Sequence, residues 1–502
     1  MIEIALIIFY ILALLLLASS HRTVEPSLKK LIKVFSYTIL VAETILIYQY
    51  KYIDNVSLVL GVSFSAISLF ISTYTLEYIK IQHYPNVLEP LMDFFLLSII
   101  TTYIAPSLVI LATSWTIGEI IGYMLVKLGE EHSIEGSLTS SRGFIFTSTL
   151  TYELSVFTMI ALSIVFTSAN VGLRTLLEPF TTGEARITAS PYIIPLLFLG
   201  FIVKTANIPL HFWLPSAHSS APSPASAALS GLMVSLGYYG LLRILQYVDA
   251  SSLIYPITWF FTVVGLLSIL YGGLQAIQQR DAKKLLAYST IATDGFISLL
   301  FAHYIAFPSP TKLWTLILGI LMHAAYKTTL FSEAGLIEAV YGTRYIHGLR
   351  GFTATAPLST LGGLMAVFTL VGVPGTIGFI VKIFSIFNCI AIYSEDHVIS
   401  LTLLLGITLY IALSAIVGLK YAQIYIGGKP LKIPSLIESP DNAIQLPITA
   451  LGSLNIVFNL ALPLLQPTEV SYVFSSSSLI SLLALFTIYM NFKAATRGVA
   501  PR

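Results

Sequence analysis

Long apolar runs separated by short polar connections make up nearly the whole chain. Most runs hold about 20 residues, the length that an α-helix needs to cross a hydrocarbon core ~30 Å thick. The pattern predicts about fifteen membrane crossings. They are placed at residues 2–19, 31–50, 56–79, 87–105, 106–127, 143–168, 191–210, 224–245, 251–277, 284–306, 312–340, 356–393, 398–426, 443–466 and 474–493. The run 356–393 is too long for one straight helix, and we interpret it as one broken crossing.

The composition fits a protein that lies almost entirely within a lipid bilayer. Hydrophobic residues make up 56% of the chain and charged residues only 10%, so there is no room for a sizeable soluble domain. The net charge of +2 gives no reason to expect a nucleic-acid partner. The single cysteine, Cys389, excludes a disulfide framework and a cysteine-ligated cluster. We therefore predict an all-α polytopic membrane protein whose first apolar run is a transmembrane helix.

The basic residues predict an orientation. With the N-terminus outside, eighteen Lys and Arg residues fall on inside segments and five on outside segments. Cytoplasmic connections normally carry the excess of positive charge. We therefore expect an integral protein of the plasma membrane, with its N-terminus outside and its C-terminus in the cytoplasm.

Three lysines, Lys204, Lys327 and Lys382, lie inside apolar runs. An ammonium group in hydrocarbon costs several kcal/mol, so such residues are rare and usually serve ion movement. Pro209 and Pro215 follow Lys204, and we expect them to stop the helix and free backbone carbonyls. Freed carbonyls at membrane depth are tolerated only against a cavity or the protein interior.

A second break, Gly372-Val-Pro-Gly375, precedes Lys382. Burial disfavours the charged form of an amine, so each lysine becomes able to release a proton. A lysine that only packs its chain and reaches toward the membrane surface is the alternative interpretation.

Further titratable residues accompany the lysines. His323 and Lys327 are four residues apart and so share one face of a helix, where an imidazole can pass a proton on. Glu119 lies within the fifth crossing and needs a cationic partner, for which Lys204 is the best candidate. Asp294 in the tenth crossing is a further acid. Glu153 and Glu333 are weaker candidates that are equally consistent with structural hydrogen bonding.

Taken together, these motifs resemble a known family. Residues 204–243, with the start Lys-Thr-Ala-Asn-Ile-Pro-Leu-His-Phe-Trp-Leu-Pro, are similar to the signature of antiporter-like proton-pumping subunits. Such subunits occur in respiratory complex I, in related membrane-bound hydrogenases and in multisubunit sodium/proton antiporters. Segments 281–290, 323–335 and 372–382 also fit, and the resemblance covers roughly residues 56–440.

The resemblance implies fourteen core helices with two inverted five-helix repeats, each containing one broken helix. Here the repeats would be residues 87–246 and 251–426. Residues 1–86 would supply three N-terminal helices, and residues 443–502 the C-terminal helices and a basic tail. A matched pair of interrupted helices is also where membrane physics places an ion site.

The resemblance also implies roles for the buried groups. Lys204 resembles the channel lysine paired with a glutamate, Lys327 the central connecting group, and Lys382 the terminal lysine that exchanges with the outside. A proton would pass from Lys204 through His323 and Lys327 to Lys382. From the repeat symmetry we infer that Asp294 is the acid that serves Lys327 or Lys382.

Two positions depart from the family pattern. The family glutamate usually follows the tryptophan directly, where this chain has Thr116, and Glu119 comes three residues later. The family often has a lysine at the position of Ser235. The entry half of the path therefore differs from that of typical members.

The sequence contains no redox cofactor motif, so we expect no cofactor in this chain and no enzyme activity from the chain alone. Iron–sulfur or other redox cofactors would belong to partner subunits of an NADH dehydrogenase-like or hydrogenase-like complex. The leading interpretation is a proton-translocating subunit of such a complex. A Na⁺/H⁺ antiporter subunit is the first alternative, because oxygen groups could ligate Na⁺. A structural membrane spacer that no longer pumps is the second.

Overall fold

The computed structural model describes residues 2–132, 140–165, 181, 192–346, 348–425 and 440–460. These residues are helical apart from their connections and one isolated β-bridge between Asp281 and Tyr345. The predicted crossing 474–493 and the basic tail that ends at Arg502 lie outside the described residues. The prediction of an all-α polytopic membrane protein is confirmed.

The chain forms two compact units, Met1–Val264 and Gly265–Arg502. The helices of the first unit are α1 (Ile2–Arg22), α2 (Pro26–Gln49), α3 (Asn55–Gln82), α4 (Leu88–Tyr103), α5 (Leu108–His132), α6 (Ser140–Phe144), the π-helical turn η1 (Ile145–Thr149), α7 (Leu150–Val165), α9 (Ile194–Lys204), α10 (Trp213–Ser220), α11 (Ser223–Ala228), the π-helical turn η2 (Leu229–Met233), α12 (Leu236–Tyr247) and the 3₁₀ turn η3 (Ser251–Leu253).

The boundary between the units falls within α13 (Ile254–Gln278). The second unit continues with α14 (Ala282–Ala306), α15 (Pro310–Tyr341), α16 (Phe352–Thr355), α17 (Pro357–Val371), α18 (Ile377–Ala391), α19 (His397–Ala422) and α20 (Asn442–Leu460).

Ten helical stretches among the described residues are long and apolar enough to cross a membrane. Four shorter apolar helices end near Arg22, Lys204, Val371 and Ala391. Three of the four, α9, α17 and α18, are short because the chain breaks beside them. The predicted broken crossing at 356–393 is confirmed as α17 and α18 with the break at 372–376.

One detail of the predicted breaks is wrong. Pro215 does not stop a helix but lies in the first turn of α10. Its missing N–H would have no intrahelical partner in that turn, so proline is tolerated there. Pro209 does lie in the irregular segment that separates α9 from α10.

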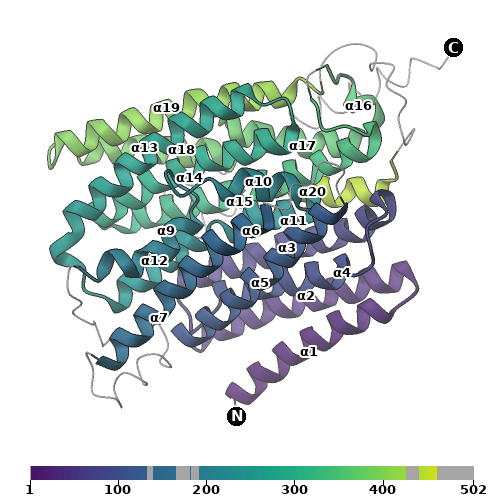
Figure 1. The fold of residues 1–502 in the computed structure, drawn as a ribbon, viewed down its shortest axis with the longest axis horizontal. Coiled ribbons are helices and arrows are strands. Elements are labelled where there is room, and N and C mark those ends of the chain that lie inside the picture. The colour runs from purple at the N-terminus through teal and green to yellow at the C-terminus, as the bar shows by residue number, and fades with distance from the viewer. Residues whose placement is uncertain are drawn as a thin grey trace. The chain divides into compact units, whose positions relative to one another are not determined.

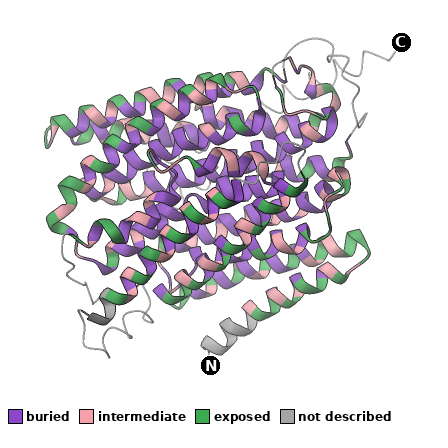
Figure 2. Ribbon diagram, in the orientation of Figure 1, coloured by how far each residue is buried: buried purple, intermediate pink, exposed green. Residues whose placement is uncertain are grey.

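Neighbouring helices pack along their lengths within each unit. In the first unit α1 packs on α2, α2 on α3, α3 on α4 and α4 on α5, as Figure 1 shows. In the second unit α15 packs against α14, α17 and α18. Figure 2 shows exposed positions along helices such as α19, whereas α14 and α15 are almost entirely buried. The side chains of Asp294, His323 and Lys327 on these two helices are therefore enclosed by protein.

Small residues allow a close helix contact in the second unit. A Cβ atom at Gly452 of α20 would lie 2.4 Å from the Cα atom of Gly362 in α17. No side chain larger than glycine fits at this crossing, so the two backbones touch directly. This contact fixes α17, whose C-terminal end forms one side of the second break.

Candidate functional site

The first site lies where α9 ends. Lys204 is the last residue of α9, and its side chain has no exposed surface. Its Nζ atom lies 2.7 Å from Oε1 of Glu119 on α5, whose side chain is equally buried. The structure therefore places the two predicted partners in one ion pair, although Glu119 occupies a different helical position from the usual family glutamate.

Hydroxyl groups from the π-helical turn η1 complete this site. Lys204 donates a hydrogen bond of 2.9 Å to Ser148 Oγ, and Ser148 in turn donates to Glu119 Oε2 at 3.2 Å. Thr149 lies 3.5 Å from the same carboxylate oxygen. A π-helical turn is wider than an α-helical turn and is frequent at functional sites. Here it directs two consecutive hydroxyls to one carboxylate.

Aromatic groups enclose the pair. The indole N–H of Trp115 donates to Glu119 Oε1 at 2.9 Å. The Lys204 ammonium lies 4.8 Å from the ring centroid of Phe144 and 5.3 Å from that of Trp213. Cation–π attraction to the ammonium and the hydrogen bond from the indole therefore add to the contacts of the ion pair.

The two positions that depart from the family pattern have distinct surroundings. Thr116 donates a hydrogen bond of 2.6 Å to Oε1 of Glu153 on α7. Thr116 occupies the position of the usual family glutamate, and its hydroxyl is bonded to an acid on a neighbouring helix. Ser235 is fully buried and directly precedes α12.

The second site surrounds Lys327 in the middle of α15. Its Nζ atom donates to the backbone carbonyl of Leu286 at 2.6 Å and to Ser289 Oγ at 2.5 Å, both on α14. Asp294, also on α14, interacts electrostatically with Lys327. It lies 3.6 Å from Nδ1 of His323. The side chains of Asp294, His323 and Lys327 are all fully buried.

Hydroxyl groups continue from this cluster. Thr293, next to Asp294, lies 2.6 Å from the hydroxyl of Tyr326 and 3.2 Å from that of Tyr410. The Lys382 ammonium lies 5.4 Å from the centroid of the Tyr410 ring. Polar side chains from α14, α15 and α19 thus lie between the neighbourhoods of Lys327 and Lys382.

The third site is at the break between α17 and α18. Lys382 donates to the carbonyls of Leu370 and Val371 at 2.7 and 2.9 Å, and to Ser414 Oγ of α19 at 2.9 Å. The two carbonyls belong to the last turn of α17, where no further helical N–H can reach them. A helix C-terminus carries partial negative charge and so favours a cation.

Glu333 lies elsewhere on α15. Its carboxylate accepts hydrogen bonds from the hydroxyls of Tyr425 and Ser359, the latter at 3.4 Å. A Cβ atom at Gly363 would lie 2.4 Å from both carboxylate oxygens, so the glycine provides the space for this acid. These hydroxyl donors fit the structural interpretation of Glu333.

Some residues of these sites have no distinctive sequence pattern. Ser148, Thr149 and Ser414 are ordinary hydroxyl residues of apolar helices, and only the fold brings them to the lysines. Trp115 lies four residues before Glu119, a spacing that places both on one helix face and could have indicated their hydrogen bond.

Comparison with known proteins gives a consistent assignment. Residues 105–408 match the family described as NADH:quinone oxidoreductase/Mrp antiporter, TM. A probable K⁺/H⁺ antiporter subunit of Rhizobium meliloti is 30% identical over 331 residues, which are 63% of this chain and 31% of that protein. An NADH-quinone oxidoreductase subunit N of Desulforudis audaxviator is 32% identical over 219 residues, or 43% of this chain and 42% of that protein.

A solved structure shares the fold. The structure of the Mrp complex from Dietzia sp. DQ12-45-1b contains a chain that superimposes with a TM-score of 0.74 at 18% sequence identity. The match covers 94% of this chain and 99% of that chain. The curated relatives above are matched over less than half of their own length. The family match covers more than half of this chain, and the protein therefore belongs to the NADH:quinone oxidoreductase/Mrp antiporter transmembrane family.

Proposed function

We propose that this protein translocates protons across the plasma membrane as one subunit of a redox-driven complex. The observation that carries the proposal is the fully buried Lys204–Glu119 pair at a broken helix, lined by the hydroxyls of Ser148 and Thr149. Buried ion pairs are weak sources of stability, because desolvation offsets their attraction. The desolvation of the Lys204–Glu119 pair thus brings little stability, and the pair lies beside hydroxyl groups that can relay protons. Both features favour a transport role.

The driving force would be electrostatic. A unit charge that arrives ~10 Å from a buried group, at an effective dielectric of about 20, changes its energy by roughly 1.7 kcal/mol. That energy is enough to shift a proton-binding equilibrium by more than tenfold. A charge change in a partner subunit would open the Lys204–Glu119 pair, and Lys204 would then release its proton. The order of transfer among Lys204, His323, Lys327 and Lys382 stays the one predicted from the sequence.

The partners follow from the same reasoning. The energy source, with iron–sulfur or other redox cofactors, would reside in other subunits. A relative is named as a subunit of an NADH-quinone oxidoreductase, which supports a place in a multisubunit complex. The N-terminus would face outside and the C-terminus the cytoplasm.

A Na⁺/H⁺ antiporter subunit is the second candidate. Relatives are named as antiporter subunits, and the Mrp complex shares the fold. Flux measured with and without sodium on the same proteoliposomes separates the candidates. Proton flux that needs no sodium supports the leading proposal, and strict sodium dependence supports the antiporter.

The decisive experiment uses the intact complex reconstituted in proteoliposomes. Lys204→Met would leave a buried carboxylate unpaired, so we pair it with Glu119→Gln to restore the charge balance. The double variant is expected to assemble but to lose about a hundredfold in proton flux, the typical effect of removing a proton-transfer group. Lys127→Met is the control, because Lys127 is exposed on the same helix as Glu119.

The double variant also separates transport from structure. If the pair only supports the fold, the balanced double variant keeps wild-type flux, and the spacer interpretation stands. Flux that is lost in the double variant and retained in Lys127→Met supports translocation through Lys204.

A further inference from the structure

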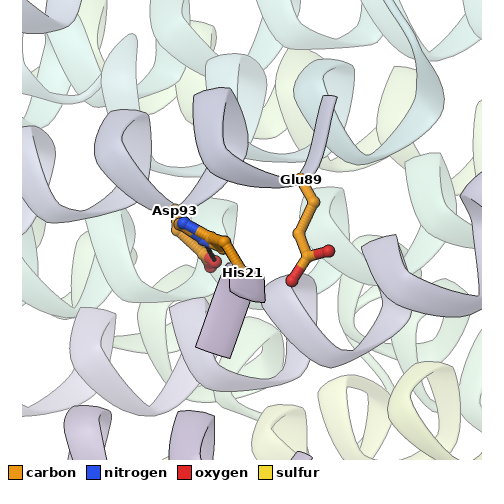
Figure 3. A group of neighbouring side chains, drawn as sticks. All are labelled: His21, Glu89 and Asp93. Atoms are coloured by element: carbon orange, nitrogen blue, oxygen red, sulfur yellow. Dashed lines mark hydrogen bonds and ion pairs between the residues drawn. The ribbon is translucent and has the colours of Figure 1, made fainter. Parts of the chain in front are cut away.

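A second buried charge cluster lies in the N-terminal helices, outside the residues that match the family. Lys33 of α2 forms ion pairs with Asp93 and Glu89, both on α4. His21 Nε2, at the end of α1, lies 2.9 Å from Asp93 Oδ2. Figure 3 shows His21 beside Asp93, with Glu89 to one side. The side chains of Lys33 and Asp93 are 1% and 2% exposed.

This cluster is connected to a surface pocket. The pocket has a volume of about 140 Å³ and is lined by residues that include Lys29, Glu77 and Glu89. Lys29 and Glu89 form an ion pair of 2.9 Å at the pocket wall. Glu89 is 3.3 Å from Lys33, which in turn is bonded to Asp93. A continuous series of polar contacts therefore leads from the pocket to His21.

The cluster is unsuited to a metal ion despite its donor atoms. The nearest ligand atoms of His21, Glu89 and Asp93 all lie within 4.8 Å of one another, as a metal site would require. The ammonium of Lys33, however, already binds both carboxylates and so supplies the positive charge that a metal would bring. The mobile species that suits this arrangement is a proton.

The charges near His21 are nearly balanced. The titratable groups that face the cluster are Lys29, Lys30, Lys33 and Tyr37 from α2, Glu77 and Lys80 from α3, and Glu89 and Asp93 from α4. Lys29 and Lys33 balance Glu89 and Asp93, so a proton that is added at His21 gives these five groups a net positive charge. Histidine is the side-chain type whose charge ordinarily changes between about pH 5 and 8.

We propose that Glu89, Lys33, Asp93 and His21 form a second proton-loading site, which takes protons from the pocket and supports the translocation proposed above. Glu89 takes a proton from water in the pocket. Lys33 then gives one of its protons to Asp93 and regains one from Glu89. Asp93 passes that proton to Nε2 of His21, which can accept it while the neutral imidazole carries its hydrogen on Nδ1. The 2.9 Å contact, with a hydrogen between Nε2 and Oδ2, is then the loaded state. Each intermediate group returns to its starting state, and the imidazolium remains beside the Asp93 carboxylate. The proposal rests on the proposed function, because it supplies protons to the same transport.

Ser72 and Tyr37 hold Asp93 in place for this transfer. Both hydroxyls donate to Asp93 Oδ1, the Tyr37 bond being 3.3 Å long. Oδ2 is thereby left for Lys33 and His21. One carboxylate oxygen thus exchanges protons while the other anchors the side chain, which is a positioning role for Ser72 and Tyr37.

The test measures proton flux against pH in proteoliposomes of the intact complex. His21→Gln keeps a hydrogen-bond donor for Asp93 and leaves the Lys33 ion pairs intact, so folding is expected to persist. We expect its flux to fall at least about tenfold and its pH dependence between about pH 5 and 8 to flatten. His132→Gln is the matched control, because His132 ends α5, is exposed and lies outside the cluster.

A second pair of variants tests the entry from the pocket. Glu89→Gln removes the first acceptor, whereas Glu77→Gln changes a pocket acid that is bonded to Lys30 and Lys80 instead. Only Glu89→Gln is expected to reproduce the His21→Gln profile. If Glu89→Gln fails to fold, His21→Gln decides alone.

The outcomes separate this proposal from the proposed function. Wild-type flux and pH dependence in His21→Gln would overturn the loading site, and the Lys204→Met plus Glu119→Gln variant would still report on the proposed function in the same assay. A loss that occurs equally in His132→Gln would also overturn it, because the effect would then be unspecific.

Discussion

Among the three lysines of the proposed path, only Lys204 has a carboxylate as its main oxygen partner. Lys204 has a carboxylate, Lys327 a backbone carbonyl and a serine, and Lys382 the end of a helix together with a serine. An ammonium that faces a carboxylate loses a strong attraction on deprotonation, whereas one that faces neutral oxygens loses less. Lys204 is therefore bound by an opposite charge, whereas Lys327 and Lys382 are held by neutral oxygens.

The buried Arg243 shows what a structural ion pair looks like in this protein. Arg243 of α12 donates to both oxygens of Asp54, the N-cap of α3, with 2.7 Å for each bond. Burial alone would raise the pKa of Asp54, but the hydrogen bonds and charge of Arg243 hold that pKa below its usual value. The pair stabilises the folded protein above the unfolded pKa of about 3.9, and this contribution is lost as the pH falls through the lower folded value.

We therefore predict a pH-dependent effect of Asp54→Asn on stability. At pH 7 the variant should lose about 1–3 kcal/mol in free energy of unfolding, because a charged hydrogen-bonded partner is removed. The difference from wild type should shrink below about pH 4. Thermal unfolding of the purified protein at both pH values measures it, with the exposed Glu131→Gln as control. An equal loss at both values would contradict the assignment.

The sequence alone identifies site residues of a type that is rare in apolar runs, such as lysine. It does not identify site residues of a type that is common there, such as serine. A lysine in an apolar run stands out because hydrocarbon penalises its charge. Ser148 and Ser414 do not stand out, since hydroxyls are common in membrane helices. Lys33 is one of the eighteen basic residues that the charge count places on inside segments, but its side chain is buried against Asp93 of α4. The four-residue spacing of Glu89 and Asp93 could have indicated that cluster.

At the scale of elements, two kinds of irregularity build the sites. The π-helical turn η1 presents two hydroxyls to Glu119, and the broken crossing presents free carbonyls to Lys382. Glycine and proline marked the break at 372–376 in the sequence. The π-helical turn has no comparable marker, because its residues, Ile-Phe-Thr-Ser-Thr, also suit an α-helix.

The break between α17 and α18 depends on Gly372. This residue has φ +90°, and a Cβ atom there would lie 2.9 Å from Lys382 Cδ and 3.2 Å from Nζ. We predict that Gly372→Ala costs about 1–3 kcal/mol of stability through backbone strain and lowers proton flux by displacing the ammonium. Flux per assembled complex and thermal unfolding measure the two effects.

The same substitution elsewhere provides the control for Gly372→Ala. A Cβ atom at Gly143 of α6 meets no other atom within 4 Å. Gly143→Ala should therefore keep wild-type flux and gain about 0.5–1 kcal/mol, because alanine favours a helix. If Gly372→Ala behaves like Gly143→Ala, the positive φ and the close contact do not matter for Lys382.

At the scale of the whole molecule, the predicted orientation can be tested directly. Replacing the buried Cys389 by alanine gives a cysteine-free background. Lys284 and Glu395 are both exposed, and the charge distribution places Lys284 inside and Glu395 outside. A membrane-impermeant maleimide should label Lys284→Cys only in inverted vesicles and Glu395→Cys only in right-side-out vesicles. The reverse pattern would invert the orientation and the proposed direction of transport.

The crossings themselves were largely predictable, because hydrocarbon thickness sets helix length and apolar runs reveal it. The helix ends differ from the predicted ends by a few residues. For example, α5 extends to His132, whereas the predicted crossing ends at residue 127. The prediction that Pro215 stops a helix was wrong because a proline interrupts a helix only beyond its first turn. Which side chains meet across helices depends on rotation about each helix axis, and hydropathy does not encode that rotation.

The resting place of Lys382 has a consequence for heredity. Two of its three partners are peptide oxygens, which every amino acid carries. No single codon change can delete them, whereas one nucleotide can erase the acid that Lys204 requires. During evolution, substitutions should therefore change the carboxylate partner of Lys204 more readily than the partners of Lys382. The carbonyls that bind Lys382 remain available as long as α17 ends at Val371.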